Sequence, residues 1–181
     1  MHVAVKRGNI EVINELIRIK YPLNEPKVNG ITALGISAIH GKLQIMKKLV
    51  ENGADVNLTS PAGISPLYLA IKARNIECIR YLFEKGAKSY LNDPIWVDFS
   101  PVFLAVTTCM VSVLEIMCDL KEDLDSYKDS QGYTPFTLAI KHAIHDVVNY
   151  LSLRGVNLDQ EDPEGKTVLQ AYILNQAELL N

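Results

Sequence analysis

Glycine recurs in this chain at a fixed spacing of 33 residues, and this period restricts the fold more than any other feature. Four pairs have the spacing: Gly8 and Gly41, Gly30 and Gly63, Gly53 and Gly86, and Gly132 and Gly165. A unit this short cannot bury its apolar face alone, so successive copies must stack. The period therefore predicts an array of similar stacked units.

Each copy has the same internal order. A turn of the form Gly-x-Thr/Ser-Pro begins it, and proline suits the first helical turn because that N–H has no partner. A short helix follows, then a polar or glycine break, then a second helix. Small residues are expected where the first helices meet their neighbours, namely at Ser37, Ala38, Ala70, Ala105 and Ala139.

The second helix has apolar residues in the order i, i+1, i+3, i+4. In the third copy these are Cys78, Ile79, Tyr81, Leu82 and Phe83, and in the fifth Val147, Val148, Tyr150, Leu151 and Leu153. A glycine follows this helix at Gly53, Gly86 and Gly155, where a left-handed conformation is expected.

These motifs resemble those of the ankyrin repeat family. The matching segments are Ser65 to Ala70 (SPLYLA), Thr134 to Ala139 (TPFTLA) and Gly53 to Asn57 (GADVN), while Met1 to Ala4 fills the Leu-His-x-Ala position. The resemblance implies an all-α solenoid of paired antiparallel helices with hairpin or β-turn tips. It also implies that His2 braces a turn, and it gives about six repeats, the first and last incomplete. The expected repeats are 1–25, 26–59, 60–94, 95–128, 129–161 and 162–181.

Two departures from the pattern stand out. The step from Pro66 to Pro101 is 35 residues, and the extra length falls within residues 90–99. Other residues replace the expected glycines at five helix ends, so the sequence does not define those ends. These residues are Lys20, Arg74, Cys109, Lys121 and Ala143.

Composition narrows the class of protein. The chain has 181 residues, 48% of them hydrophobic, and a formal net charge of -3. This balance argues against a uniformly basic nucleic-acid binder, and no apolar run is long enough to cross a membrane. The first residues do not resemble a signal peptide, and Cys78, Cys109 and Cys118 form no C-x-x-C pair. We expect a cytoplasmic protein, with the nucleus or an association with the cytoskeleton also open.

No motif predicts catalysis, a cofactor or a metal. Gly165-Lys166-Thr167 resembles the end of a phosphate-binding loop, but Gln160 stands where the first glycine is required. His142 and His145 have no third ligand at a recognisable spacing, and no base is evident for a cysteine nucleophile. The chain is therefore expected not to be an enzyme.

Two polar features have a structural interpretation beside a functional one. The acidic run of Asp119, Glu122, Asp123 and Asp125 is expected to be a solvated surface, with a site for a basic partner as the alternative. The family resemblance implies that Asn57 hydrogen-bonds its turn, or alternatively that a 2-oxoglutarate oxygenase hydroxylates it.

The resemblance also implies that partner proteins bind the hairpin tips and the outward face of the first helices. By register, the two positions before each break carry basic or titratable nitrogens in four of five copies and an acid in none. We predict a basic stripe that binds a protein through an acidic segment of that partner. The alternative is that long cations simply solubilise an exposed helix. The predicted binding residues here are Lys6, Arg7, Ile39, His40, Lys72, Lys141 and His142.

The lengthened tip adds aromatic and apolar residues to this set. Trp96 and Val97 precede Asp98, which replaces the tip glycine, and these two positions are expected to point away from the stack. Trp96 is predicted to be a binding anchor, with the alternative that it covers a gap left by the divergent fourth copy. Phe99 and Tyr133 complete the set.

Three classes of function follow. A monomeric adaptor, scaffold or inhibitor that binds a protein partner is favoured. A structural subunit, or the repeat segment of a larger assembly, is the alternative. An enzyme is disfavoured because no acid–base pair, nucleophile or metal set stands out.

Overall fold

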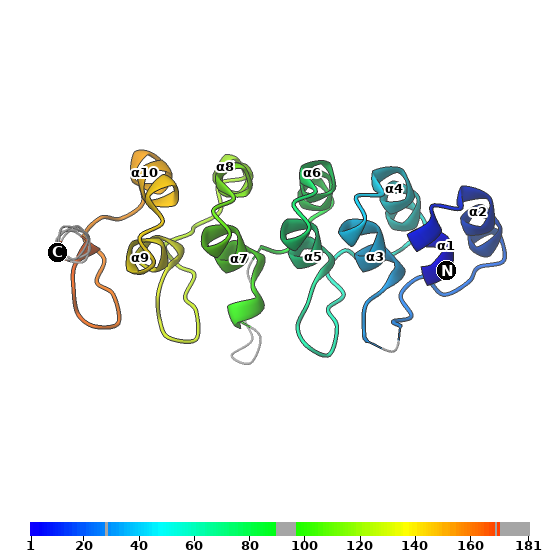
Figure 1. Ribbon diagram of the computed structural model, residues 1–181, viewed down its shortest axis with the longest axis horizontal. Coiled ribbons are helices and arrows are strands. Elements are labelled where there is room, and N and C mark those ends of the chain that lie inside the picture. Colours follow the sequence, from blue (N-terminus) through cyan, green and yellow to red (C-terminus); the bar gives the residue numbers. More distant parts are fainter. Residues whose placement is uncertain (28, 90–96, 169, 171–181) are drawn as a thin grey trace. The chain divides into compact units, whose positions relative to one another are not determined.

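The computed structural model describes residues 1–27, 29–89, 97–168 and 170. Within these residues the chain forms ten α-helices in antiparallel pairs, which confirms the expected all-α fold (Figure 1). The chain divides into two compact units, unit 1 at Met1–Ser89 and unit 2 at Tyr90–Asn181.

Unit 1 contains three helix pairs. The first helices are α1 (His2–Arg7), α3 (Ala33–Ile39) and α5 (Pro66–Lys72). The second helices are α2 (Ile10–Arg18), α4 (Leu43–Glu51) and α6 (Ile76–Glu84). Helix α3 packs against both α1 and α5, and α4 packs against α6. The first helices of this unit therefore lie side by side in one row (Figure 1).

Unit 2 contains two helix pairs among its described residues. They are α7 (Pro101–Thr107) with α8 (Val111–Asp119), and α9 (Pro135–Lys141) with α10 (His145–Leu153). A short 3₁₀ turn, η1 (Val97–Phe99), precedes α7. Helix α7 packs against α9 and α8 against α10, which repeats the arrangement of unit 1.

The Thr/Ser-Pro dipeptide begins the first helices as the sequence predicts. The Ser65 side chain accepts a hydrogen bond from the Tyr68 backbone N–H, and Pro66 occupies the first turn of α5. Thr134 caps α9 in the same way, with Pro135 in its first turn. These caps satisfy N–H groups that have no partner within the helix.

The expected hairpin tips are present. The Ser60 N–H donates to the Ile64 carbonyl at 3.0 Å, and the Gly63 N–H donates to the Ser60 carbonyl at 2.9 Å. The same two bonds close residues 129–133 and 162–166, so the tip of the sixth predicted copy forms. Residues 169 and 171–181 of that copy lie outside the described residues.

The second helices end as predicted. Gly53, Gly86 and Gly155 have φ of 95°, 80° and 80°, which confirms the left-handed position. All five residues that replace a glycine also have positive φ, so side chains here do not shift the helix ends. The angles are 56° at Lys20, 58° at Arg74, 53° at Cys109, 59° at Lys121 and 51° at Ala143.

The core is built from the predicted positions, with one correction. Ala38, Ala70, Cys78 and Ile79 are at most 1% exposed, whereas Leu153, which the apolar pattern included, is 86% exposed. By register, Leu153 occupies the position of a charged residue in the other copies. Those residues are Arg18, Glu51, Glu84 and Asp119. The position faces solvent regardless of the side chain that it carries.

Asparagine side chains connect successive repeats in unit 1. The Asn57 amide donates to the Gly86 carbonyl at 3.0 Å, and its oxygen accepts from the Lys88 N–H at 2.8 Å. Asn24, 33 residues earlier, makes the same pair of bonds to Gly53 and Asp55. Asn57 thus has a structural role, but the turn that its side chain hydrogen-bonds belongs to the following repeat and not to its own.

Candidate partner-binding surface

The last turns of the first helices in unit 1 form a basic, exposed surface. Lys6 and Arg7 end α1, and Lys72 ends α5. All three are exposed, as are Ile39 at the end of α3 and His40, which follows it. The adjacent positions toward the core are buried, so the helices direct these last-turn residues outward. The predicted residues of unit 1 thus share one row of helices.

This surface carries no carboxylate. Residues 1–10, 26–43 and 59–76 cover the three first helices, the two hairpin tips and the breaks, and they contain no Asp or Glu. The seven acids of unit 1 belong to the second helices and the loops after them. They are Glu11, Glu15, Glu25, Glu51, Asp55, Glu77 and Glu84.

The lysine of the stripe in unit 2 has a different environment. Lys141 Nζ lies 3.9 Å from the centroid of the Tyr133 ring and 3.0 Å from Gln131 Oε1. The Tyr133 hydroxyl donates to Glu164 Oε1 at 3.1 Å. Lys141 is therefore held against the hairpin tip of its own repeat, while His142 next to it is exposed.

The predicted residues of the lengthened tip do not share one environment. Val97 is 7% exposed, so the expectation that it points away from the repeats is wrong. Its place in a 3₁₀ turn that packs on α7 buries the side chain. Phe99 is half-buried, Tyr133 is 4% exposed, and Trp96 lies outside the described residues.

The two units differ strongly in charge. Unit 1 has 13 Lys and Arg against 7 Asp and Glu, a formal net charge of +6. Unit 2 has 5 against 14, a net charge of -9, and the two values give the total of -3. The total charge conceals this segregation, which counting by repeat would have found. The basic character of the stripe is thus concentrated in unit 1.

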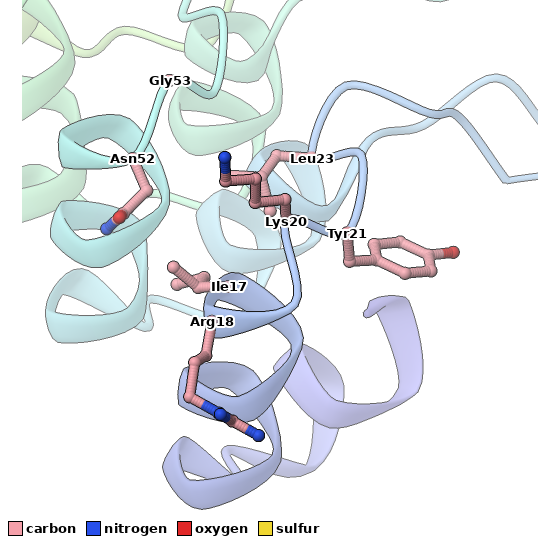
Figure 2. Close-up of a pocket in the computed structure, with 7 residues that line it drawn as sticks. All are labelled: Ile17, Arg18, Lys20, Tyr21, Leu23, Asn52 and Gly53. Carbon is pink, nitrogen blue, oxygen red and sulfur yellow. The ribbon is translucent and has the colours of Figure 1, made fainter.

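An open cavity of about 410 Å³ lies in unit 1, where α2 and α4 end (Figure 2). Arg18 at its edge donates two hydrogen bonds to Glu15, at 2.9 and 2.6 Å. In Figure 2 the Tyr21 side chain points away from the other lining side chains. The arrangement does not converge on one point, so it does not define a ligand. The cavity is lined by Ile17, Arg18, Lys20, Tyr21, Leu23, Asn52 and Gly53.

The buried thiol has the opposite of the properties that a nucleophile needs. Cys78 is 1% exposed, and burial, with a smaller effect of Glu77, raises its pKa to about 11. Burial also raises the pKa of Cys118. Thiols in this state are protonated at neutral pH and react slowly. Cys78 acts as a small apolar core residue, as the sequence predicts.

The described residues hold neither a metal-binding cluster nor a membrane-spanning helix. Within them, no group of three or more His, Cys, Asp or Glu side chains is placed to hold a metal ion. Over the same residues, every helix is too short or too polar to cross a membrane.

Comparison with known sequences agrees with this architecture. The family described as "Ankyrin repeats (3 copies)" matches residues 1–93. The probable 26S proteasome regulatory subunit p28 of Saccharomyces cerevisiae is 26% identical over 77% of this chain and 62% of its own length. The tyrosine-protein kinase HTK16 of Hydra vulgaris is 23% identical over 87% of this chain and only 21% of its own.

A third relative matches this chain over a larger share of its own length. The Notch-regulated ankyrin repeat-containing protein A of Danio rerio is 33% identical over 48% of this chain and 80% of its own length. The first two relatives extend well beyond the part that this chain spans. The similarity to these two relatives therefore supports the repeat architecture and does not extend to the rest of either protein.

Proposed function

The chain belongs to the ankyrin repeat family, and from that premise we propose that it is a non-enzymatic protein-interaction module. Ankyrin repeats in general bind proteins. The observation that carries the proposal here is the exposed basic surface on the first helices of unit 1, which has no carboxylate. His142, Phe99, Trp96 and the Tyr133–Lys141 pair are proposed as further contacts in unit 2.

Electrostatics supports a binding role for this surface. Lys6 and Arg7 on α1 and Lys72 on α5 lie on either side of α3, and none of the three first helices supplies a carboxylate to pair with them. A partner of opposite charge supplies that pairing and associates faster because long-range attraction guides its approach. The charges of this surface therefore favour binding of a partner and do not stabilise the fold.

The compartment and the absence of catalysis are parts of the same proposal. Three free cysteines fit a reducing compartment, so we place the protein in the cytoplasm or nucleus. The raised pKa of Cys78 supports a structural role for that thiol. We propose that the chain acts as an adaptor, scaffold or inhibitor and is monomeric without its partner.

Site-specific photo-cross-linking in native cells tests the function. A photoreactive amino acid replaces Ile39 on the candidate surface and, as a matched control, Arg80, which is exposed on α6. We expect a partner protein to be captured at position 39 and not at position 80, and to be lost when Lys6→Glu and Lys72→Glu are introduced. Equal capture at both positions, or none at position 39, contradicts the proposal.

One observation favours the alternative of a structural subunit. Val3 is 58% exposed, whereas its register equivalents Ile36 and Leu69 are each 9% exposed. Val12 is 44% exposed, against 3% at Ile45 and 1% at Cys78. In later copies the preceding repeat covers these positions. We therefore propose, as the second candidate, that a helix pair of the same type packs on α1 and α2.

Val3→Lys separates the two candidates. The substitution places a charge on the outer face of α1, one turn from Lys6 and Arg7, and adds to the positive charge of the candidate partner-binding surface without removing any of its residues. If the second candidate is right, Val3→Lys dissociates the native assembly while capture at position 39 in the free chain persists. An assembly that is unchanged in size on native gel filtration counts against it.

A further inference from the structure

The candidate surface of unit 1 has an internal order that specifies its partner further. Lys6, Ile39 and Lys72 are successive equivalents at the 33-residue period, and each lies in the last turn of a first helix. Helices α1, α3 and α5 lie side by side (Figure 1). The three equivalent positions therefore follow one another in a row across these helices, in the order cation, apolar, cation. Ile39 is 37% exposed, a fraction that leaves part of an apolar side chain available between two charges.

The distance between helices sets the spacing of any segment that crosses this row. Packed helices are about 8–10 Å apart. A segment in the polyproline II conformation has three residues per turn and advances about 3.1 Å per residue, so one turn spans the step from one helix to the next and every third side chain faces the same way. A segment lying across the first helices thus meets α1, α3 and α5 with every third residue.

We propose that this row binds an extended protein segment with carboxylates at positions i and i+6 and an apolar side chain at i+3. The inference rests on the proposed function, since it names the chemistry of the partner for the same surface. The two carboxylates pair with Lys6 and Lys72, with Arg7 next to the first. The apolar side chain covers Ile39, and His40 lies beside that contact.

A protein segment fits the row better than a nucleic acid does. Every unit of a nucleic-acid strand carries a phosphate, so a crossing strand would place one against Ile39. Single strands also depend on aromatic side chains on which bases stack. The row offers an aliphatic side chain at that point, and an acidic segment with an apolar residue matches both of its properties.

The probe is an acetylated seven-residue peptide with glutamate at both ends, leucine in the centre and glycine and serine between. A second peptide of the same composition has both glutamates adjacent at one end and leucine at the other. A third probe is a short single-stranded DNA of mixed sequence. Because exposed ion pairs add only about two- to fivefold each, weak binding is measured by amide chemical-shift titration of the full ¹⁵N-labelled chain.

We expect the first peptide to shift the amides of Lys6, Ile39 and Lys72 and to bind at least threefold more tightly than the rearranged one. The advantage should shrink in about 0.5 M salt, where screening acts over a few ångström. Lys72→Glu should weaken binding about threefold to tenfold. Ile39→Ser should remove the preference for central leucine. Arg80→Glu, an equal change of charge on α6, should alter affinity by less than about twofold.

Three results would overturn the inference: equal binding of the two peptides, tighter binding of the DNA, or the same loss in Arg80→Glu as in Lys72→Glu. The experiments distinguish failure of this inference from failure of the proposed function. Protein capture at position 39 without discrimination between peptides removes only the spacing rule. Absence of both removes the binding surface itself.

Discussion

Asp98 accepts two hydrogen bonds from Ser130, one from the backbone N–H at 2.8 Å and one from the hydroxyl at 2.6 Å. Asp98 stands where the other copies have their tip glycine, and Ser130 belongs to the tip of the following repeat. A carboxylate that accepts both donors of one residue fixes its position more firmly than a single contact does. The described end of the lengthened tip is therefore attached to its neighbour.

Removing this carboxylate should loosen both tips. We expect Asp98→Ala to lower the free energy of unfolding by about 1 kcal/mol, since the bonds are charge-assisted but exposed. Urea unfolding measures the loss, and Asp159→Ala, which removes another exposed carboxylate, should have little effect. Ser130→Ala combined with Asp98→Ala should cost no more than Asp98→Ala alone. Additive losses would show that the two residues act independently.

The asparagine bridge offers a second test. Asn57→Ala should cost about 1–2 kcal/mol, because it removes two bonds and leaves the Gly86 carbonyl and the Lys88 N–H without this partner. Hydrogen exchange of the Lys88 amide should become faster. Asn14→Ala, on the exposed face of α2, serves as the control and should be neutral within about 0.5 kcal/mol. An unchanged exchange rate at Lys88 would contradict the bridging role.

A glycine should improve one of the strained helix ends. Ala143 has φ of 51°, and the left-handed region costs an L-residue about 1–2 kcal/mol. Part of that gain is offset because glycine is more flexible in the unfolded chain, so Ala143→Gly should add about 0.5–1 kcal/mol. Thermal unfolding measures the change, with Gly155→Ala as the opposite substitution at another left-handed position. A lower melting temperature for Ala143→Gly would refute the strain argument.

The buried thiol predicts a dependence on alkaline pH. A cysteine in an unfolded chain loses its proton near pH 8.5, whereas burial raises the pKa of Cys78 to about 11. The unfolded state therefore releases its proton first. The stabilisation is complete below about pH 8.5 and is lost progressively as the pH rises to about 11.

Comparing the native chain with the Cys78→Ala variant separates the contribution of this thiol from those of other groups that titrate in the same range. Cys78→Ala lowers stability at neutral pH by removing buried volume, but it should show a smaller fall between about pH 8.5 and 11. Urea midpoints across this range measure both slopes. Parallel curves would mean that Cys78 does not contribute.

Trp96 remains a prediction about binding. If it is an anchor, Trp96→Ala should weaken binding of the captured partner by about 2 kcal/mol or more while the melting temperature of the free protein barely moves. If it packs in the core, the same change should destabilise the fold by about 3–5 kcal/mol. A large loss of stability in the free protein would decide against the anchor.

The features that the 33-residue period determines, namely the helix ends and the buried positions, are the ones that the sequence predicts best. Gly53 and Gly86 mark helix ends because the repeat requires a left-handed backbone conformation at these positions. Ala143 adopts the same conformation at its helix end although it has a side chain. Position within a copy also predicted the burial of Cys78. The apolar pattern of α10 alone includes Leu153, whereas the equivalent positions of the other copies carry charged residues and face solvent.

Features that depend on neighbours outside the helix were harder to predict. Lys72 and Lys141 are equivalent by register, yet Tyr133 and Gln131 hold Lys141. The register predicts that Val97 points outward, but its 3₁₀ turn packs on α7 and buries it. Lateral contacts of this kind require the arrangement of loops in space.

The identical bonding of Asn24 and Asn57 has a consequence for how such a chain can change its length. Each asparagine reaches only the copy that follows it, 29 and 31 residues further on. Duplicating or deleting one whole 33-residue unit of DNA-encoded sequence would leave every remaining asparagine with the same two partners. An insertion of another length has to be absorbed by a loop within the bridged span, as between Asp125 and Asn157, where the equivalent bond spans 32 residues. Growth in whole units needs no such adjustment.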